Sequence, residues 1–566
     1  MLTLPAKPGT LTDEQRSAHN THSVGAVLLV LSVILLYVYA FTYAGRTVGL
    51  PLPQALAERC GLQLKDVFTD DGVVKSTLWV SQAEEFKNTE NEMLAYYCML
   101  AAAFLCVYFL PVRLKRDALS IGTLLMIGVL CGRTSLGWFL FAHLATYLIL
   151  HPDRRARPWT AALPGCAAVL LFHGKPLFLA RVFVLLPVAS YFAYFPIRIL
   201  CDHPRLGPIL RACASQSFLI IGIGTFILGK IFHFNWSFHL GMLLFFGQWL
   251  RLIPYYLDHS HGLIPPDLPL RRYLATFLCP ALLPLGFYEM ISQGYAYTEA
   301  TYLCENKNRI VLGGAKLLLV GLLYLVLGRW LCYRLAEGAG LLGINAYHAN
   351  IKNLTRAYLA GGHIATASLL VTSLLELLRF SLWWGGISHF KVGVWRILGF
   401  QVDRNFNYWL LSTNMVELWR RWTFHYREFL VRAFYYPVFF RLSHLSPAVR
   451  ITAATFAAAF FGNFIWGHAL EVFFYESIML KSFFPRWPYF ALISASIALT
   501  QLYQRRYRSG RKPWTRGPAI AGDLVCAYLT IQFYALIHVF SLIPSNTSPT
   551  AWDLTKLFLV GFGIRI

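Results

Sequence analysis

Apolar segments about as long as a bilayer is thick recur along the chain. A helix needs about 20 apolar residues to cross a bilayer, and only 14% of the residues are charged, against roughly 25% in soluble proteins. The clearest segments are Val24–Ala44, Met93–Val112, Pro176–Leu200, Phe218–Phe234, Thr276–Ser292, Val311–Leu331, Ile364–Trp384, Val449–Phe474, Trp487–Tyr503 and Leu524–Ile543. They predict an all-α, polytopic integral membrane protein with about ten to thirteen transmembrane helices.

The positive charge predicts the orientation of these helices. The formal charge is +23, and Lys and Arg concentrate in short segments at 112–117, 151–158 and 504–516. Short loops rich in Lys and Arg stay cytoplasmic, which explains the charge without a nucleic-acid partner. The long polar segment Gly45–Asn91 is expected on the opposite side. Residues 1–22 form a polar N-terminal tail, and 23–566 form a single multi-span membrane domain.

The segment 405–437, NFNYWLLSTNMVELWRRWTFHYREFLVRAFYYP, concentrates charge among aromatic residues. Read as one helix, it places Glu417 four residues before Arg421, a favourable ion-pair spacing. One stripe of this helix is aromatic and consists of Trp419, Trp422, Tyr426 and Phe429. A second stripe is polar and consists of Arg420, Thr423 and Arg427. The pattern fits either an interfacial helix with a solvated basic face or a reaction centre.

A second polar group lies in the apolar segment 460–476, FFGNFIWGHALEVFFYE. His468 is followed three residues later by Glu471, so both lie on one face of a helix. An intramembrane histidine is costly unless it faces a cavity or a partner. A core histidine bonded to a carbonyl is the alternative. The cysteines show no spacing typical of a metal site, so none is expected.

These segments resemble the membrane-bound O-acyltransferase (MBOAT) family, in particular its bacterial branch for polysaccharide O-acetylation and teichoic-acid D-alanylation. The ungapped match consists of Asn405-Phe406-Asn407, Ser412, Glu417, Trp419-Arg420-Arg421-Trp422, Tyr435 and Pro437. The family's Gly-Leu-Trp-His-Gly signature is similar to Ile465-Trp466-Gly467-His468-Ala469. A weaker likeness lies at 277–286, FLCPALLPLG, and the resemblance places the catalytic core at about 270–480.

The resemblance implies an intramembrane tunnel in which a cytoplasmic acyl thioester meets a hydroxyl acceptor from the other side. His468 is the expected general base, oriented by Glu471, and Thr423 or His425 is the expected catalytic partner that polarises the thioester carbonyl. The residues expected to bind substrate are Asn407, Glu417, Trp419, Arg420, Arg421, Trp422 and Glu471. No cofactor is expected beyond acyl-CoA or an acyl-carrier thioester as co-substrate.

The expected acceptor is an extracytoplasmic glycan or an exported small molecule, with a membrane lipid as the alternative. The expected location is the bacterial plasma (inner) membrane, among membrane lipids. An accessory secreted or periplasmic protein is a further candidate partner.

Two departures from the family leave other functions open, and the first is that one residue separates Trp466 from His468. The second is that the family has His or Asn where this chain has Thr423, and on a continuous helix His425 lies about 200° around the axis from that position. A non-catalytic scaffold derived from the family is therefore one alternative. A transporter or flippase that uses the intramembrane charges Glu289 and Glu376 is another.

Overall fold

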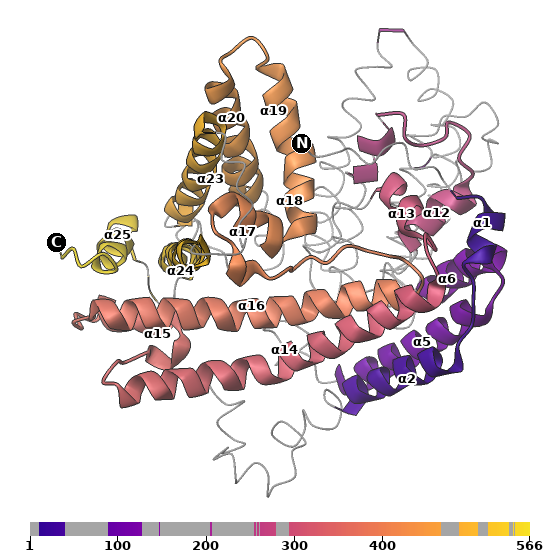
Figure 1. The fold of residues 1–566 in the computed structure, drawn as a ribbon, viewed down its shortest axis with the longest axis horizontal. Helices are drawn as coiled ribbons and strands as arrows, with labels where there is room; N and C mark the ends of the chain where they lie inside the picture. Colours follow the sequence, from indigo (N-terminus) through magenta and orange to yellow (C-terminus); the bar gives the residue numbers. More distant parts are fainter. Residues whose placement is uncertain are drawn as a thin grey trace, which may run out of the picture. The chain divides into compact units, whose positions relative to one another are not determined.

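The computed structural model describes residues 11–39, 89–126, 254–278 without 256 and 260, 294–465, 486–507, 519–542 and 549–565, with the single positions 147, 204, 205 and 547. Throughout these ranges the regular structure is helical, and the only β-type pairing is an isolated bridge between Tyr302 and Phe400. Figure 1 shows this helical architecture. The prediction of an all-α protein is confirmed for this part of the chain.

The helices before residue 342 are α1 (Asp13–Ala18), α2 (Val24–Val38), α5 (Thr89–Phe109), α6 (Val112–Met126), α12 (Leu270–Leu278), α13 (Tyr295–Thr301) and α14 (Lys307–Leu341). The later α-helices are α15 (Ile351–Leu359), α16 (Thr366–Ile397), α17 (Met415–Trp422), α18 (Phe424–Leu430), α19 (Tyr436–Arg441), α20 (Pro447–Phe456), α23 (Trp487–Tyr507), α24 (Ala519–Ile537) and α25 (Ala551–Val560). Two π-helices, η8 (Val431–Tyr435) and η9 (Ala457–Ile465), and three 3-10 turns, η6 (Tyr347–Ala349), η7 (Trp409–Leu411) and η11 (His538–Phe540), complete the described elements.

Three helices among the described residues are long and apolar enough to cross a membrane. They are Lys307–Leu341, Thr366–Ile397 and Ile520–Phe540. Each contains or overlaps an apolar segment predicted from the sequence. At 1.5 Å per residue, the 35 residues of α14 span about 52 Å, more than the roughly 30 Å hydrocarbon core. The predicted spans Pro176–Leu200 and Phe218–Phe234 lie outside the described residues.

The chain groups into two compact units. The first contains Met1–Pro51, Phe68–Leu319 and Lys391–Asp403, and the second contains Leu52–Val67, Val320–Phe390 and Arg404–Ile566. The boundaries fall inside α14 and α16, so each of these helices contributes residues to both units.

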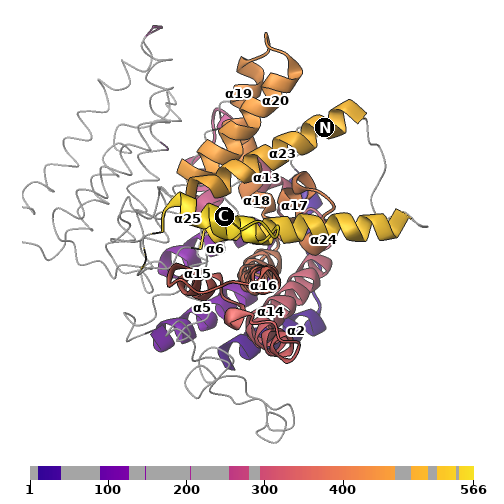
Figure 2. The ribbon, with the colours of Figure 1, turned by 90° about the vertical axis from the view of Figure 1, so that its left-hand side faces the viewer.

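Glycines bring α14 and α16 into close contact within each unit (Figures 1 and 2). In the first unit, a Cβ atom at Gly314 would lie 2.8 Å from the carbonyl oxygen of Gly393. In the second unit, a Cβ atom at Gly386 would lie 2.6 Å from Cγ of Leu325. Residue numbers rise along one helix as they fall along the other, so the pair is antiparallel. Small residues at such seams allow the close backbone approach on which helix association in membranes depends.

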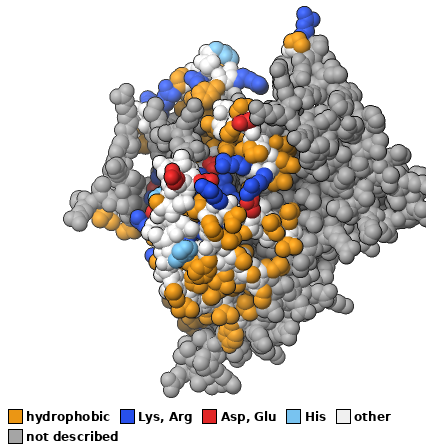
Figure 3. Space-filling model, turned by 90° about the vertical axis from the view of Figure 1, so that its right-hand side faces the viewer, with side chains coloured by type: hydrophobic (Ala, Val, Ile, Leu, Met, Phe, Trp, Pro, Cys, Tyr) orange, Lys and Arg blue, Asp and Glu red, His pale blue; other side chains and the backbone are white. Residues whose placement is uncertain are grey.

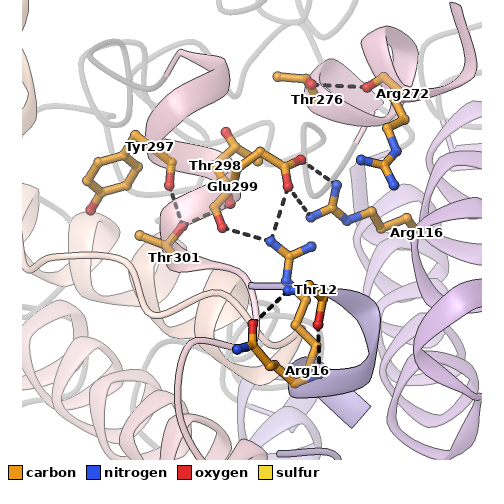
Figure 4. Close-up of polar contacts among 10 residues, drawn as sticks. Thr12, Arg16, Arg116, Arg272, Thr276, Tyr297, Thr298, Glu299 and Thr301 are labelled. Carbon is orange, nitrogen blue, oxygen red and sulfur yellow. Dashed lines mark hydrogen bonds and ion pairs between the residues drawn. The ribbon is translucent and has the colours of Figure 1, made fainter. Parts of the chain in front are cut away.

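In the first unit, a buried carboxylate ties the predicted N-terminal tail to the helices. A capping box between Thr12 and Gln15 starts α1. Arg16 of this helix donates from Nη2 to the carbonyl oxygen and to Oε2 of Glu299, each at 3.1 Å. Arg116 of α6 also pairs with both carboxylate oxygens of Glu299, as Figure 4 shows. The second half of the tail is therefore an anchored helix rather than a free polar segment.

The basic segment 112–117 differs from the predicted loop because it forms the first turns of α6. Lys115 is 1% exposed, and its Nζ donates to the carbonyl oxygens of Val107 and Tyr108 at the end of α5. A cation at this point compensates carbonyl groups that lack helical partners. Arg113 remains exposed. On the side of the molecule drawn in Figure 3, basic and acidic side chains of the described residues gather next to hydrophobic ones.

Candidate functional site

The predicted single helix over the Trp-Arg-Arg-Trp motif is wrong, because the helix breaks at Thr423. Helix α17 ends at Trp422 and α18 begins at Phe424. Between them, Thr423 has φ −142° and ψ 65°, which is not a helical conformation. The residues predicted to lie on one helix are therefore divided between two short helices, α17 and α18.

The break is held by the chain segment that precedes η7. The carbonyl oxygen of Asn405 accepts a hydrogen bond from the backbone N–H of Phe424 at 3.1 Å, and Asn405 Oδ1 accepts one from the N–H of His425 at 3.0 Å. The N–H of Asn407 donates to the carbonyl oxygen of Arg421 at 2.8 Å. These bonds satisfy terminal groups that a continuous helix would pair internally. Asn405 is 1% exposed, and its two hydrogen bonds hold the start of α18 in place.

Two buried side-chain donors, one on α17 and one at its end, have no partner among the described residues. They are the indole Nε1 of Trp419 and the hydroxyl Oγ1 of Thr423, for which the described part of the chain supplies no acceptor. A buried polar group without a partner costs about 1–3 kcal/mol. Such groups are uncommon in folded proteins, and each calls for an explanation. A bound acceptor atom would provide one.

His425 lies directly after the break and is completely buried. Its ring contacts the ring of Phe424 edge-on, with the centroids 5.2 Å apart. The separation of about 200° expected on a continuous helix does not apply here, because the chain turns at Thr423. His425 and Thr423 are both candidates for the family's catalytic partner.

Glu417 and Arg421 form the ion pair that their spacing predicts. Nε and Nη2 of Arg421 donate to Glu417 Oε1 at 3.0 and 2.6 Å. The other carboxylate oxygen accepts from the backbone and the hydroxyl of Thr413 at 3.1 and 3.0 Å. The side chain of Arg420, in contrast, is 61% exposed and lies 3.9 Å from Glu417. Arg421 is thus fixed by the protein, and Arg420 is the cation that remains exposed.

Arg427 carries the polar stripe onto α18. Its backbone N–H donates to the carbonyl oxygen of Thr423 at 2.9 Å, so the two residues are one helical turn apart. Its guanidinium pairs with Glu428, whereas its Nε is buried without a partner in the described part of the chain. Burial, together with the positive charge of Arg420, lowers the pKa of Arg427 to about 10. It therefore remains charged at neutral pH.

Trp422 lies in the hydrophobic core of the second unit. It is 5% exposed, and its ring packs edge-on against Trp409 and Tyr534 with centroid distances of 4.6 and 5.2 Å. The ring of Phe380 from α16 stacks on it at 6.4 Å. Figure 2 shows α17 next to α24, which carries Tyr534. These contacts give Trp422 a packing role, in addition to the substrate contact expected from the family motif.

The element that leads to His468 packs against α18. Tyr426 donates its hydroxyl to Oδ1 of Asn463 in the π-helix η9 at 3.2 Å. A Cβ atom at Gly462 would lie 2.9 Å from Leu430 and from Phe434, so η9 approaches these residues closely. Segments of π-helix occur frequently at functional sites. His468 and Glu471 themselves lie outside the described residues, which end here at Ile465.

A buried histidine that was not predicted from the sequence, His538, lies close to this site. His538 is 6% exposed, and its Nδ1 lies 2.7 Å from the carbonyl oxygen of Tyr534, to which it donates. Its Nε2 therefore accepts from the hydroxyl of Tyr489 at 3.4 Å, and that hydroxyl lies 3.3 Å from the hydroxyl of Tyr534. The sequence did contain a signal, since His538 falls inside the predicted span Leu524–Ile543.

Comparison with known proteins adds no assignment: no protein-family model matches the chain, and no curated protein matches it.

Proposed function

We propose that the chain is a membrane-embedded O-acyltransferase of the MBOAT type. It moves an acyl group from a cytoplasmic thioester to a hydroxyl of an extracytoplasmic glycan or of an exported small molecule. In this proposal about ten to thirteen helices cross the bacterial plasma membrane and surround a reaction tunnel. The three long apolar helices of the described part support the membrane component of this proposal.

The observation that carries the proposal is the helix break at Thr423 with its buried, unpartnered hydroxyl. Acyl transfer needs hydrogen-bond donors that already point at the place where negative charge develops. The hydroxyl occupies the motif position at which the MBOAT resemblance expects a catalytic partner. Asn405 and the Glu417–Arg421 pair hold the surrounding backbone in place. A donor that is already oriented costs no reorganisation during the reaction.

His468 supplies the general base in this proposal, with Glu471 as its orienting partner. The acceptor hydroxyl loses its proton to His468 as its oxygen attacks the thioester carbon, and the departing thiolate later takes that proton. The close packing of η9 on α18 supports an approach of the two signature segments. The exposed Arg420 is suited to the phosphates of a CoA donor.

The alternative functions, a transporter, a non-catalytic scaffold and a lipid acyltransferase, predict different properties for these residues. A transporter would need uncompensated intramembrane charge, but Glu376 is paired with Arg379 at 2.9 Å, and Glu289 lies outside the described residues. This pair favours a structural role. A non-catalytic scaffold would tolerate replacement of His468, and a lipid acyltransferase would label lipid rather than glycan.

The test is transfer of label from radiolabelled acetyl-CoA by purified protein in liposomes, with a bacterial glycan extract supplied as acceptor. We expect transfer by the wild type and none by His468→Ala at equal expression and membrane insertion. Trp552→Phe, at an exposed position of α25, is the matched control and should retain full activity. Transfer by His468→Ala within a few-fold of wild type would refute the mechanism. Absence of transfer from any thioester donor by the wild type would refute the function.

A further inference from the structure

The two unpartnered donors at the end of α17 are four residues apart. Trp419 lies in the last turn of α17, and Thr423 is the C-cap residue of that helix. We propose that Trp419 Nε1–H and Thr423 Oγ1–H together bind the carbonyl oxygen of the acyl thioester and stabilise its negative charge during transfer. This inference rests on the proposed function and assigns Trp419 as a catalytic residue that contributes through its N–H group.

The chemistry of the two groups defines the ligand atom. An indole N–H can only donate a hydrogen bond, and a hydroxyl donates one. Both groups are buried, and the part of the chain that the structure describes leaves both without an acceptor. Buried tryptophan normally finds a partner for its N–H. A single acceptor atom with room for two hydrogen bonds, such as a carbonyl oxygen, would satisfy both donors.

The protein holds the Trp419 side chain in position before any ligand arrives. The ring of Trp419 packs against the core cluster that contains Leu418 and Trp422. The Glu417–Arg421 pair and the Thr413 contacts brace the turns on either side of Trp419. Helix α17 packs against α23 in the same unit. Rigid support of this kind is what an oxyanion-binding site requires.

The reaction balances with this assignment. As the acceptor oxygen forms its bond to the thioester carbon, the electron pair of the C=O π bond moves onto the carbonyl oxygen. Both donors then shorten their hydrogen bonds to that oxygen. When the oxyanion collapses, the C–S bond breaks, the thiolate takes the proton held by the base, and the new ester is released. Each donor keeps its own proton throughout.

The sharpest test replaces Trp419 with β-(3-benzothienyl)alanine, which keeps the bicyclic ring and exchanges N–H for sulfur. We expect kcat to fall about 10²-fold, as for other lost oxyanion donors, with KM for the thioester nearly unchanged. Thermal stability should not fall, since an unsatisfied buried donor has been removed. The same replacement at the exposed Trp552 is the control and should leave kcat unchanged. Full activity of the Trp419 replacement in a preparation whose wild type is active would overturn the inference alone.

A binding measurement separates the inference from the proposed function. The probe is the ketone analogue of acetyl-CoA, which has the carbonyl group but cannot transfer an acyl group. We expect the infrared carbonyl stretch of the bound probe to lie at lower frequency with wild type than with Trp419→Phe or Thr423→Val. An identical frequency in all three proteins would overturn the assignment even if transfer is observed. Failure of the probe to bind the wild type would count against the proposed function itself.

Discussion

Asn405 accepts a hydrogen bond on Oδ1 from the backbone N–H of His425 at 3.0 Å, and this contact fixes the start of α18. Asn405→Ala should lower the free energy of unfolding by about 0.5–2 kcal/mol, the usual cost of a lost helix cap. Turnover should also fall, because Thr423 is no longer held at the break. Thermal unfolding in detergent, together with the transfer assay, measures both effects.

Asn407→Ala is the matched stability control for this prediction. The side chain of Asn407 is exposed, and its observed hydrogen bond uses the backbone N–H, which alanine retains. Its effect on stability should stay within about 0.5 kcal/mol. Equal destabilisation by the two variants would show that Asn405 does not hold the start of α18 in place.

Thr423 and His425 compete for the role of the family's catalytic partner, and three substitutions separate them. Thr423→Val should lower kcat about 10²-fold, because it removes one polarising hydrogen bond, and should not lower thermal stability, because the hydroxyl is unpaired. Thr423→Ser should retain most activity. His425→Gln should cost less than Thr423→Val. Complete loss at His425 with a fully active Thr423→Val would reverse the assignment.

How much of this site the sequence could predict depends on the range of the interactions. The Glu417–Arg421 pair was predicted because both partners lie on one helix. The break at Thr423 was not, since periodicity favours helix on both sides and the residue that breaks it, Asn405, is 20 positions from its partner His425. The Arg16–Glu299 contact spans 283 positions and leaves no local pattern.

For the long helices, the sequence predicted the apolar centres better than the ends. Hydropathy located the apolar centres at Val311–Leu331 and Ile364–Trp384, whereas the helices extend over Lys307–Leu341 and Thr366–Ile397. Hydropathy reports which residues avoid water, but a helix continues through polar residues until its backbone is capped or broken. The sequence therefore predicted these helices and missed several of their ends.

Arg421→Lys tests whether the motif helix needs a planar guanidinium. Arginine donates to Glu417 from two nitrogen atoms, and lysine cannot reproduce this geometry. We expect kcat/KM to fall about three- to tenfold, because one charge-assisted hydrogen bond is lost. Arg441→Lys at an exposed position at the end of α19 is the control and should be silent. A fully active Arg421→Lys would favour the interfacial amphipathic helix with interchangeable cations.

The two-sided reaction scheme requires a defined topology. The segment Arg505–Arg516 contains six cationic and no acidic residues, which predicts a cytoplasmic location. Gly45–Asn91 should lie on the other side. Single cysteines at Ser509 and Ser81, both in segments whose structure is not described, should be labelled by an impermeant reagent from opposite sides of the membrane. Labelling of both from one side would contradict the separate entry of donor and acceptor.

Glu299→Gln should destabilise the first unit strongly, because it leaves Arg16 buried without its counter-ion. Removing one partner of a buried pair costs about 3–5 kcal/mol. Burial raises the pKa of Glu299, but the hydrogen bond and charge of Arg116, joined by Arg16, hold it below its usual value of 4.5. A carboxyl group whose pKa is lowered by folding stabilises the folded state at pH values above its unfolded-state pKa. This contribution disappears as the pH falls through the folded-state pKa.

The stability difference between wild type and Glu299→Gln should therefore be full at neutral pH, begin to shrink near pH 4.5, and vanish below the folded-state pKa. Thermal unfolding of both proteins in the same detergent over a pH series measures it. Glu337→Gln is the matched control, because its ion pair with Arg334 is largely solvent-exposed and contributes at most about 1 kcal/mol. A Glu299→Gln deficit that is the same at every pH would show that lost packing, and not the buried charge, anchors α1.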